Sequence, residues 1–69
     1  MGKIKVTKAK KTYYVSGIDE ETDTVTYVEN KEEATEYGGT FFTTAQIDFL
    51  KNYFSEKQPE LKKAKPVWD

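Results

Sequence analysis

The chain has 69 residues and a net charge of -1, and 33% of its residues are charged, 36% hydrophobic and 14% aromatic. This length supports one small domain, which buries about 60% of the surface of its unfolded chain, and the aromatic content argues against disorder. The chain has no cysteine and no histidine, and all eleven basic residues are lysine. This composition excludes disulfides, zinc sites of thiolate or imidazole ligands, cysteine or serine–histidine nucleophiles, and arginine fingers.

The charges are segregated along the sequence. Residues 1–11 carry five lysines and no acid, whereas residues 19–36 carry eight acidic residues and one lysine. Such runs most often form solvated faces, here with the basic ends folding back on the acidic centre; the alternative is a docking surface for a partner. No stretch approaches the ~20 apolar residues that cross a bilayer, and no apolar segment follows the first lysines as in a signal peptide. We therefore expect a cytoplasmic protein.

Two runs rich in aromatic and β-branched residues, 12–18 and 24–29, predict a β-hairpin, because five polar residues separate them. Alternation places Tyr13, Val15, Val25 and Tyr27 on the buried face of the hairpin. It places Tyr14, Ile18 and Val28 on the opposite face. Ile4 and Val6 would share one face of an N-terminal strand. The apolar positions then change parity, which predicts a break or bulge near residues 8–11.

A first short helix is expected over residues 31–37. Asn30 is a good N-cap, and Glu33 stands three residues later, where a capping box has an acid. Gly38 and Gly39 would end this helix after about two turns, since glycine adopts the left-handed conformation easily.

A second helix is expected over residues 44–57. Thr43 and Gln46 form a capping box, and Phe42 and Ile47 supply the matching hydrophobic staple. Apolar residues follow at helical spacing, and Pro59 would end the helix just before it.

These elements predict one α+β domain, with a small antiparallel sheet (hairpin 12–18/24–29 and a short third strand) packed against the two helices. Residues 1–10 and 59–69 are basic arms, flexible or folded onto the rest, and Pro66 suits an edge strand. The expected core comprises Tyr13, Val15, Val25, Tyr27, Ala34, Tyr37, Phe42, Ile47, Leu50 and Phe54.

Residues 19–23 are the only cluster that could bind a cation. Their spacing does not match a calcium loop and no glycine follows, so a solvated turn is the better interpretation. Phosphate-binding glycine loops and nucleophile motifs are absent from the sequence. We therefore expect a protein without enzymatic activity, cofactor or metal.

The order of the pieces resembles small uncharacterised phage and prophage proteins of Gram-positive bacteria. The resemblance rests on a Tyr-Tyr-Val strand at 13–15, an acidic turn, the strand 25–28, the stretch 30–34, and residues 42–47 opening a helix that ends before a proline. It covers roughly residues 12–58. Such proteins lack catalytic signatures, and the resemblance implies binding to host or phage macromolecules without assigning a role to any residue.

We therefore expect a binding module that acts through a protein partner. The periodicity leaves Tyr14 and Trp68 outside the core, so these two side chains, flanked by Lys8, Lys10 and Lys11 and by the lysines of residues 62–65, are the predicted contact surface. Trp68 could instead fold back and complete the core. The alternative function is a nucleic-acid accessory protein using the N-terminal lysine arm, although the missing arginine and the acidic centre argue against it.

Overall fold

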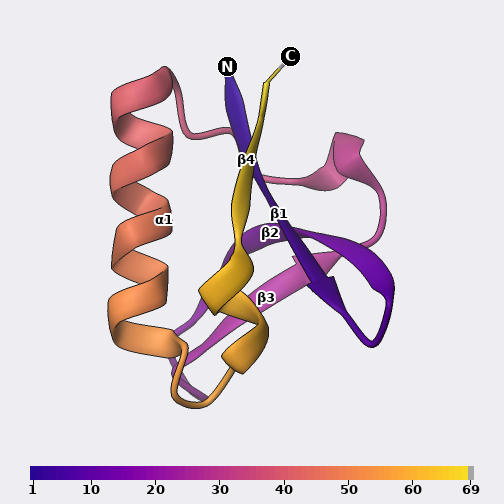
Figure 1. Ribbon diagram of the computed structural model, residues 1–69, viewed down its shortest axis with the longest axis vertical. Coiled ribbons are helices and arrows are strands. Elements are labelled where there is room, and N and C mark those ends of the chain that lie inside the picture. The colour runs from indigo at the N-terminus through magenta and orange to yellow at the C-terminus, as the bar shows by residue number, and fades with distance from the viewer. Residues whose placement is uncertain (69) are drawn as a thin grey trace.

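A four-stranded antiparallel sheet and one α-helix dominate residues 1–68, the part of the chain that the computed structural model describes (Figure 1). The strands are β1 (Gly2–Lys8), β2 (Lys11–Asp19), β3 (Thr24–Val28) and β4 (Lys65–Trp68), in the order β3-β2-β1-β4. The helix is α1 (Thr40–Phe54), and two 3-10 turns are η1 (Lys31–Glu33) and η2 (Pro59–Lys63). The predicted α+β fold is confirmed, whereas the predicted pair of α-helices is not.

Both ends of the chain take part in the sheet. β1 lies between β2 and β4, and the register places Gly2 opposite Trp68. The N- and C-terminal ends therefore lie side by side, near the first turn of α1 (Figure 1). Of the segments expected as basic arms, residues 1–10 contain β1, and residues 59–68 contain η2 and β4.

The change of parity after Val6 has a simple cause. Ala9 and Lys10 both have positive φ angles, 54° and 66°, and form a two-residue turn between β1 and β2. Left-handed residues at both turn positions match the right-handed twist of a hairpin. The turn sets Val6 opposite Tyr13, so both lie on the same face. The predicted break near residues 8–11 is thus a tight hairpin turn.

A bulge in β2 changes the expected faces of the second hairpin. Val15 pairs with Tyr27, but the next pair is Gly17 with Thr26, so Ser16 is an extra residue on β2. An extra residue reverses the alternation beyond it. Ile18 therefore lies opposite Val25, on the core side, and its prediction for the other face was wrong.

The predicted helix over 31–37 is also wrong beyond its first turn. Asn30 caps as expected, because its side chain accepts a hydrogen bond from the backbone N–H of Glu32 at 2.9 Å. The chain then becomes extended: the N–H of Thr35 donates to the carbonyl of Val15, and the N–H of Tyr37 donates to the carbonyl of Gly2. The sheet thus provides the backbone acceptors that a longer helix would have provided.

α1 occupies residues 40–54 rather than the predicted 44–57. Gly39 is its N-cap, and the N–H of Thr43 donates to the Gly39 carbonyl at 3.0 Å, the first bond of the helix. Thr43 is therefore buried inside the helix instead of capping it. The earlier start also leaves Phe42 exposed, which corrects its assignment to the core.

The core lies between the sheet, α1 and η2. Six of the ten predicted core residues are buried, and Tyr13, Tyr27 and Tyr37 are half-buried. η2 adds Leu61, which is fully buried. The apolar cluster consists of Ile4, Val6, Val15, Val25, Ile47, Leu50, Phe54, Leu61 and Ala64, with Tyr27 and Tyr37 packed against it.

Both edges of the sheet are protected. On the edge strand β4, Pro66 has no N–H and so cannot donate a hydrogen bond to the strand of another chain. On β3, the side-chain amide of Gln58 accepts a hydrogen bond from the N–H of Val25 at 2.7 Å and donates to the Val25 carbonyl at 2.9 Å. This amide takes the place of a neighbouring strand, so β3 offers fewer free groups to another chain.

Gln58→Ala should lower the free energy of unfolding by about 1–3 kcal/mol, because it leaves the backbone groups of buried Val25 without this partner. It should also increase association through the uncovered edge of β3. Chemical denaturation and light scattering measure the two effects. Gln46→Ala, which removes a half-buried glutamine from α1, is the control. Equal stability of the two variants would contradict this role of Gln58.

Candidate interaction surfaces

The described residues, 1–68, form no pocket and bring together no group of three or more acidic side chains that could hold a metal ion. Within the same range, no helix is both long enough and apolar enough to cross a membrane. The surfaces of the sheet and of α1 are therefore the candidate places for function.

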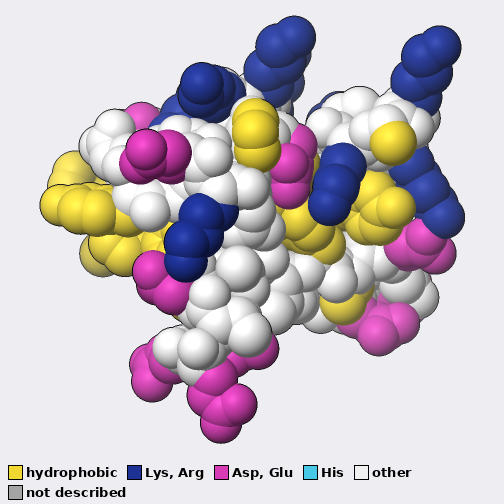
Figure 2. Space-filling model, turned by 90° about the horizontal axis from the view of Figure 1, so that it is seen from below, with side chains coloured by type: hydrophobic (Ala, Val, Ile, Leu, Met, Phe, Trp, Pro, Cys, Tyr) yellow, Lys and Arg dark blue, Asp and Glu magenta, His cyan; other side chains and the backbone are white. Residues whose placement is uncertain are grey.

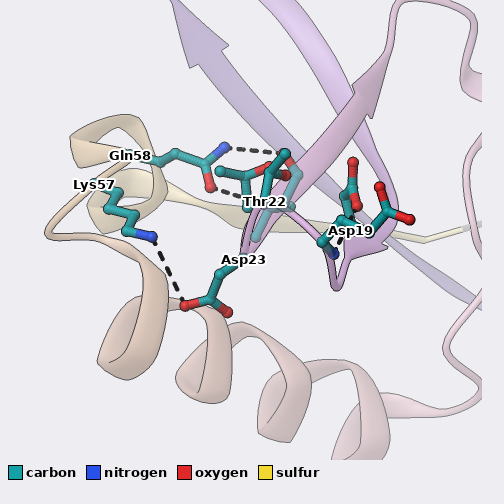
Figure 3. Close-up of polar contacts among 8 residues, drawn as sticks. Asp19, Thr22, Asp23, Lys57 and Gln58 are labelled. Carbon is teal, nitrogen blue, oxygen red and sulfur yellow. Dashed lines mark hydrogen bonds and ion pairs between the residues drawn. The ribbon is translucent and has the colours of Figure 1, made fainter.

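The acidic turn between β2 and β3 has local hydrogen bonds of its own and an ion pair to the segment after α1 (Figure 3). The carboxylate of Asp19 accepts a hydrogen bond from the N–H of Glu21 at 3.0 Å. The Asp23 carboxylate extends toward the Lys57 ammonium, 3.8 Å away, just beyond α1 (Figure 3). Both partners of this ion pair are exposed, so it contributes little to stability. The two aspartates serve different contacts and do not converge on one point.

Lysines from the two ends of the chain meet where β1 pairs with β4. The register places Lys5 directly opposite Lys65 and, on its other side, opposite Tyr14. Since Ile4 and Val6 point into the core, these three residues lie on the sheet face away from α1. Neither Lys5 nor Lys65 forms an ion pair with a described residue. We call Lys65, Lys5 and Tyr14 the lysine–tyrosine row.

The other predicted lysines lie at the β1–β2 hairpin tip. Lys8 is opposite Lys11, and both are exposed, as is Lys10 in the turn. Lys11 forms an ion pair with Glu29 and lies 5.8 Å from the centre of the Tyr13 ring. The hydrogen bond and the charge of Glu29 raise the pKa of Lys11. Lys8 and Lys10 therefore remain the freer cations of this tip.

The structure does not bring Tyr14 and Trp68 together. Tyr14 belongs to the face away from α1, whereas Trp68 lies opposite Gly2, near the core-facing Thr43 of α1. Trp68 is 48% exposed, so about half of its surface is covered by the protein and the other half is accessible to solvent. The predicted contact surface is thus divided between the two faces of the sheet.

The outer side of α1 carries an aromatic surface that was not predicted from the sequence. Phe41, Phe42, Phe49 and Tyr53 are 75%, 67%, 41% and 72% exposed. Helical spacing lines up residues 42, 49 and 53 as a second apolar stripe, which the sequence could have shown. It was missed because the predicted staple assigned Phe42 to the core. We call these four residues the α1 aromatic face.

Tyr27 joins β3 to η2 beside the Gln58 contact. Its phenol donates a hydrogen bond to the Glu60 carboxylate at 2.8 Å and accepts one from the Gln58 amide at 3.1 Å. Burial, and then the hydrogen bond to Glu60, raises the pKa of the Tyr27 phenol far above its ordinary value. Burial also raises the pKa of Tyr37.

The raised pKa of Tyr27 predicts a loss of stability at alkaline pH. Its contribution is fully present below pH ~10, where the unfolded phenol is neutral, and is lost as the pH rises toward the folded pKa. Tyr27→Phe should therefore lose stability less steeply above pH ~10 than the unchanged protein. Denaturant unfolding at a series of alkaline pH values measures the slope. Tyr53→Phe, at an exposed ring, is the control and should keep the original slope.

The chain matches no protein-family model, no curated protein and no solved structure.

Proposed function

We propose that the protein is a small non-enzymatic binding module, encoded by a phage or prophage, that docks an acidic surface of a protein partner. The docking site is the lysine–tyrosine row, to which Lys10 in the adjacent hairpin turn adds a further cation. Lys8, two residues after the core-facing Val6, lies on the other face of β1. The observation that carries this proposal is the direct cross-strand pairing of Lys5 with Lys65 without a carboxylate partner among the described residues. Like charges placed opposite each other destabilise a sheet, and an acidic ligand would relieve that repulsion.

The arrangement of charge supports an acidic partner. The basic ends of the chain pair with each other in β1 and β4 instead of covering the acidic turn. Lysine side chains project along the upper margin of Figure 2, and acidic side chains project at its lower edge, with both kinds side by side on the right. A surface with one sign of charge attracts partners of opposite charge and speeds their association.

A protein surface fits this site better than nucleic acid. The chain has no arginine, the usual side chain for guanine recognition. The acidic turn would repel a long polyanion that extends beyond the lysines. Tyr14 is half-buried between Lys5 and Val28 in the register and so offers less of its ring for stacking with a base.

Fluorescence anisotropy with a labelled polyglutamate peptide tests the proposal. The double variant Lys5→Gln/Lys65→Gln should bind at least several-fold more weakly, since it removes the paired cations. Lys62→Gln/Lys63→Gln makes the same change in net charge at exposed lysines of η2 and should bind as the unchanged protein does. Equal weakening by both double variants would show only a general charge effect and would reject the site.

The same assay decides between the two classes of partner. A single-stranded oligonucleotide of the same charge as the peptide should bind more weakly than polyglutamate. Tighter binding of the oligonucleotide, with a steep dependence on salt, would overturn the proposal in favour of nucleic acid.

A further inference from the structure

The composition of α1 differs from that of the rest of the chain. A third of all residues are charged, yet only Asp48 and Lys51 are charged among the fifteen residues of α1. The buried side of the helix is formed by Thr43, Ile47, Leu50 and Phe54. A surface helix normally places charged residues opposite such a stripe. α1 instead places the α1 aromatic face there, together with the exposed, uncharged residues Ala45 and Asn52.

The α1 aromatic face is held by ring contacts. Phe41 and Phe42 meet edge to face with centroids 5.6 Å apart, and Phe49 and Tyr53 lie 5.0 Å apart. Phe49 also contacts the buried Phe54 ring, at 5.9 Å. The face is therefore anchored to the core at one point and spreads outward from it. Hydrophobic side chains project at the left edge of Figure 2, on the side that α1 occupies in Figure 1.

The exposed area of this face is a large part of what one subunit contributes to a standard interface. From their exposed fractions, the four rings together expose on the order of 500 Å². The largest apolar patch on a typical monomer is about 300–600 Å², and such monomers are usually much larger than this chain. One side of a standard interface buries about 800 Å². The four rings and the neighbouring uncharged residues can supply most of that area.

We propose that the α1 aromatic face is the interface of a homodimer, in which α1 packs against the α1 helix of a second copy in antiparallel orientation. The face carries no charge, so a second copy can cover it without burying an unpaired ion. Phe41 and Tyr53 lie about 18 Å apart along the helix axis. A two-fold axis between them would place the Phe41 end of one helix against the Tyr53 end of the other, so that the same patch serves both copies.

This interface is independent of the site proposed for the acidic partner. The lysine–tyrosine row lies on the sheet face that points away from the core, and α1 packs on the core side. A dimer formed through α1 therefore leaves two rows open. Two rows on one assembly would strengthen binding to a partner with repeated acidic surfaces.

Sedimentation equilibrium tests the dimer. The unchanged protein should show twice the monomer mass of 8.0 kDa. Phe41→Lys/Tyr53→Lys should return the mass to that of the monomer while circular dichroism stays unchanged, because both side chains are largely exposed. Ile18→Lys introduces a lysine at an exposed apolar residue of β2 and should remain dimeric. Lys5→Gln/Lys65→Gln should also remain dimeric, which separates this proposal from the previous one.

Two results would overturn the dimer. One is a monomer mass for the unchanged protein at ~100 µM, a concentration that populates a dimer with a Kd of ~10 µM or tighter. The other is a dimer that persists in Phe41→Lys/Tyr53→Lys, which would place the contact on another face.

Because the chain has no cysteine, a single introduced thiol reports the geometry. Ala45→Cys, near the middle of the α1 aromatic face, should form a covalent dimer on mild oxidation. Glu56→Cys, beyond the end of α1, is the control and should not. Equal cross-linking of the two variants would reject the antiparallel arrangement.

Discussion

Leu50→Ala should lower the free energy of unfolding by about 2–5 kcal/mol, the range for removing a large aliphatic side chain from a packed core. Leu50 is fully buried, and α1 presents it to the sheet beside Ile47 and Phe54. Native domains are stable by only about 5–15 kcal/mol, and a chain of this size belongs at the lower end. The variant should therefore be unfolded in a measurable fraction of molecules at ambient temperature.

Thermal and denaturant unfolding, followed by circular dichroism, measure the loss. Asn52→Ala, two residues further along α1, changes an exposed side chain of the same helix and should shift the transition little. A melting temperature of Leu50→Ala equal to that of Asn52→Ala would mean that α1 does not pack on the sheet through Leu50.

The hairpin of β2 and β3 could be predicted because its signals are local. Alternating β-branched and aromatic residues on both sides of a polar turn determine the strands, and Asn30 signals the turn that follows. The bulge at Ser16 could not be predicted in this way. It depends on which residue of β3 faces Val15, and local alternation alone does not contain that information.

The first predicted helix failed for a related reason. Asn30 and Glu33 favour a helical turn, and one 3-10 turn forms. Continuing it as an α-helix would have required intrahelical acceptors for the N–H groups of Thr35 and Tyr37. Strands β2 and β1 supply these acceptors instead, through the carbonyls of Val15 and Gly2. A contact between residues 2 and 37 leaves no local signal, so helix propensity was overridden by the tertiary structure.

The candidate surfaces were predictable only in part. The segregation of lysines is visible in the sequence, but the pairing of Lys5 with Lys65 depends on β1 lying beside β4. Tyr14 lies opposite Lys5 of β1, and Trp68 lies opposite Gly2 of the same strand. Residues 2 and 5 point to opposite faces of the sheet, so Tyr14 and Trp68 do not share the face on which they were predicted to lie together. The α1 aromatic face was not predicted because the helix was expected to begin at residue 44, four residues late. The late start was expected because Thr43 also satisfies the capping pattern.

Gly2→Ala should destabilise the protein by about 1–3 kcal/mol or more, because it forces a methyl group into a filled space. A Cβ atom at residue 2 would lie 2.1 Å from Oγ1 of Thr43 and 2.6 Å from Cζ3 of Trp68. β1 cannot easily move away, since the N–H of Gly2 donates to the Gly38 carbonyl and its own carbonyl accepts from Tyr37, both at 2.8 Å. Denaturant unfolding should therefore show an early transition. Gly39→Ala, where an added Cβ meets nothing within 4 Å, is the matched control.

The clash with Thr43 can be separated from other effects of the added methyl group. Oγ1 of Thr43 is buried and has no hydrogen-bond partner among the described residues, so removing this hydroxyl sacrifices no bond within that part of the chain. Thr43→Ala would remove the closest of the three contacts and leave the Cβ atom of residue 43 at 2.9 Å and Cζ3 of Trp68 at 2.6 Å. The double variant Gly2→Ala/Thr43→Ala should then be more stable than the sum of the two single changes predicts, because the residues share one contact. Simple additivity would show that β1 and α1 do not approach each other closely at Gly2.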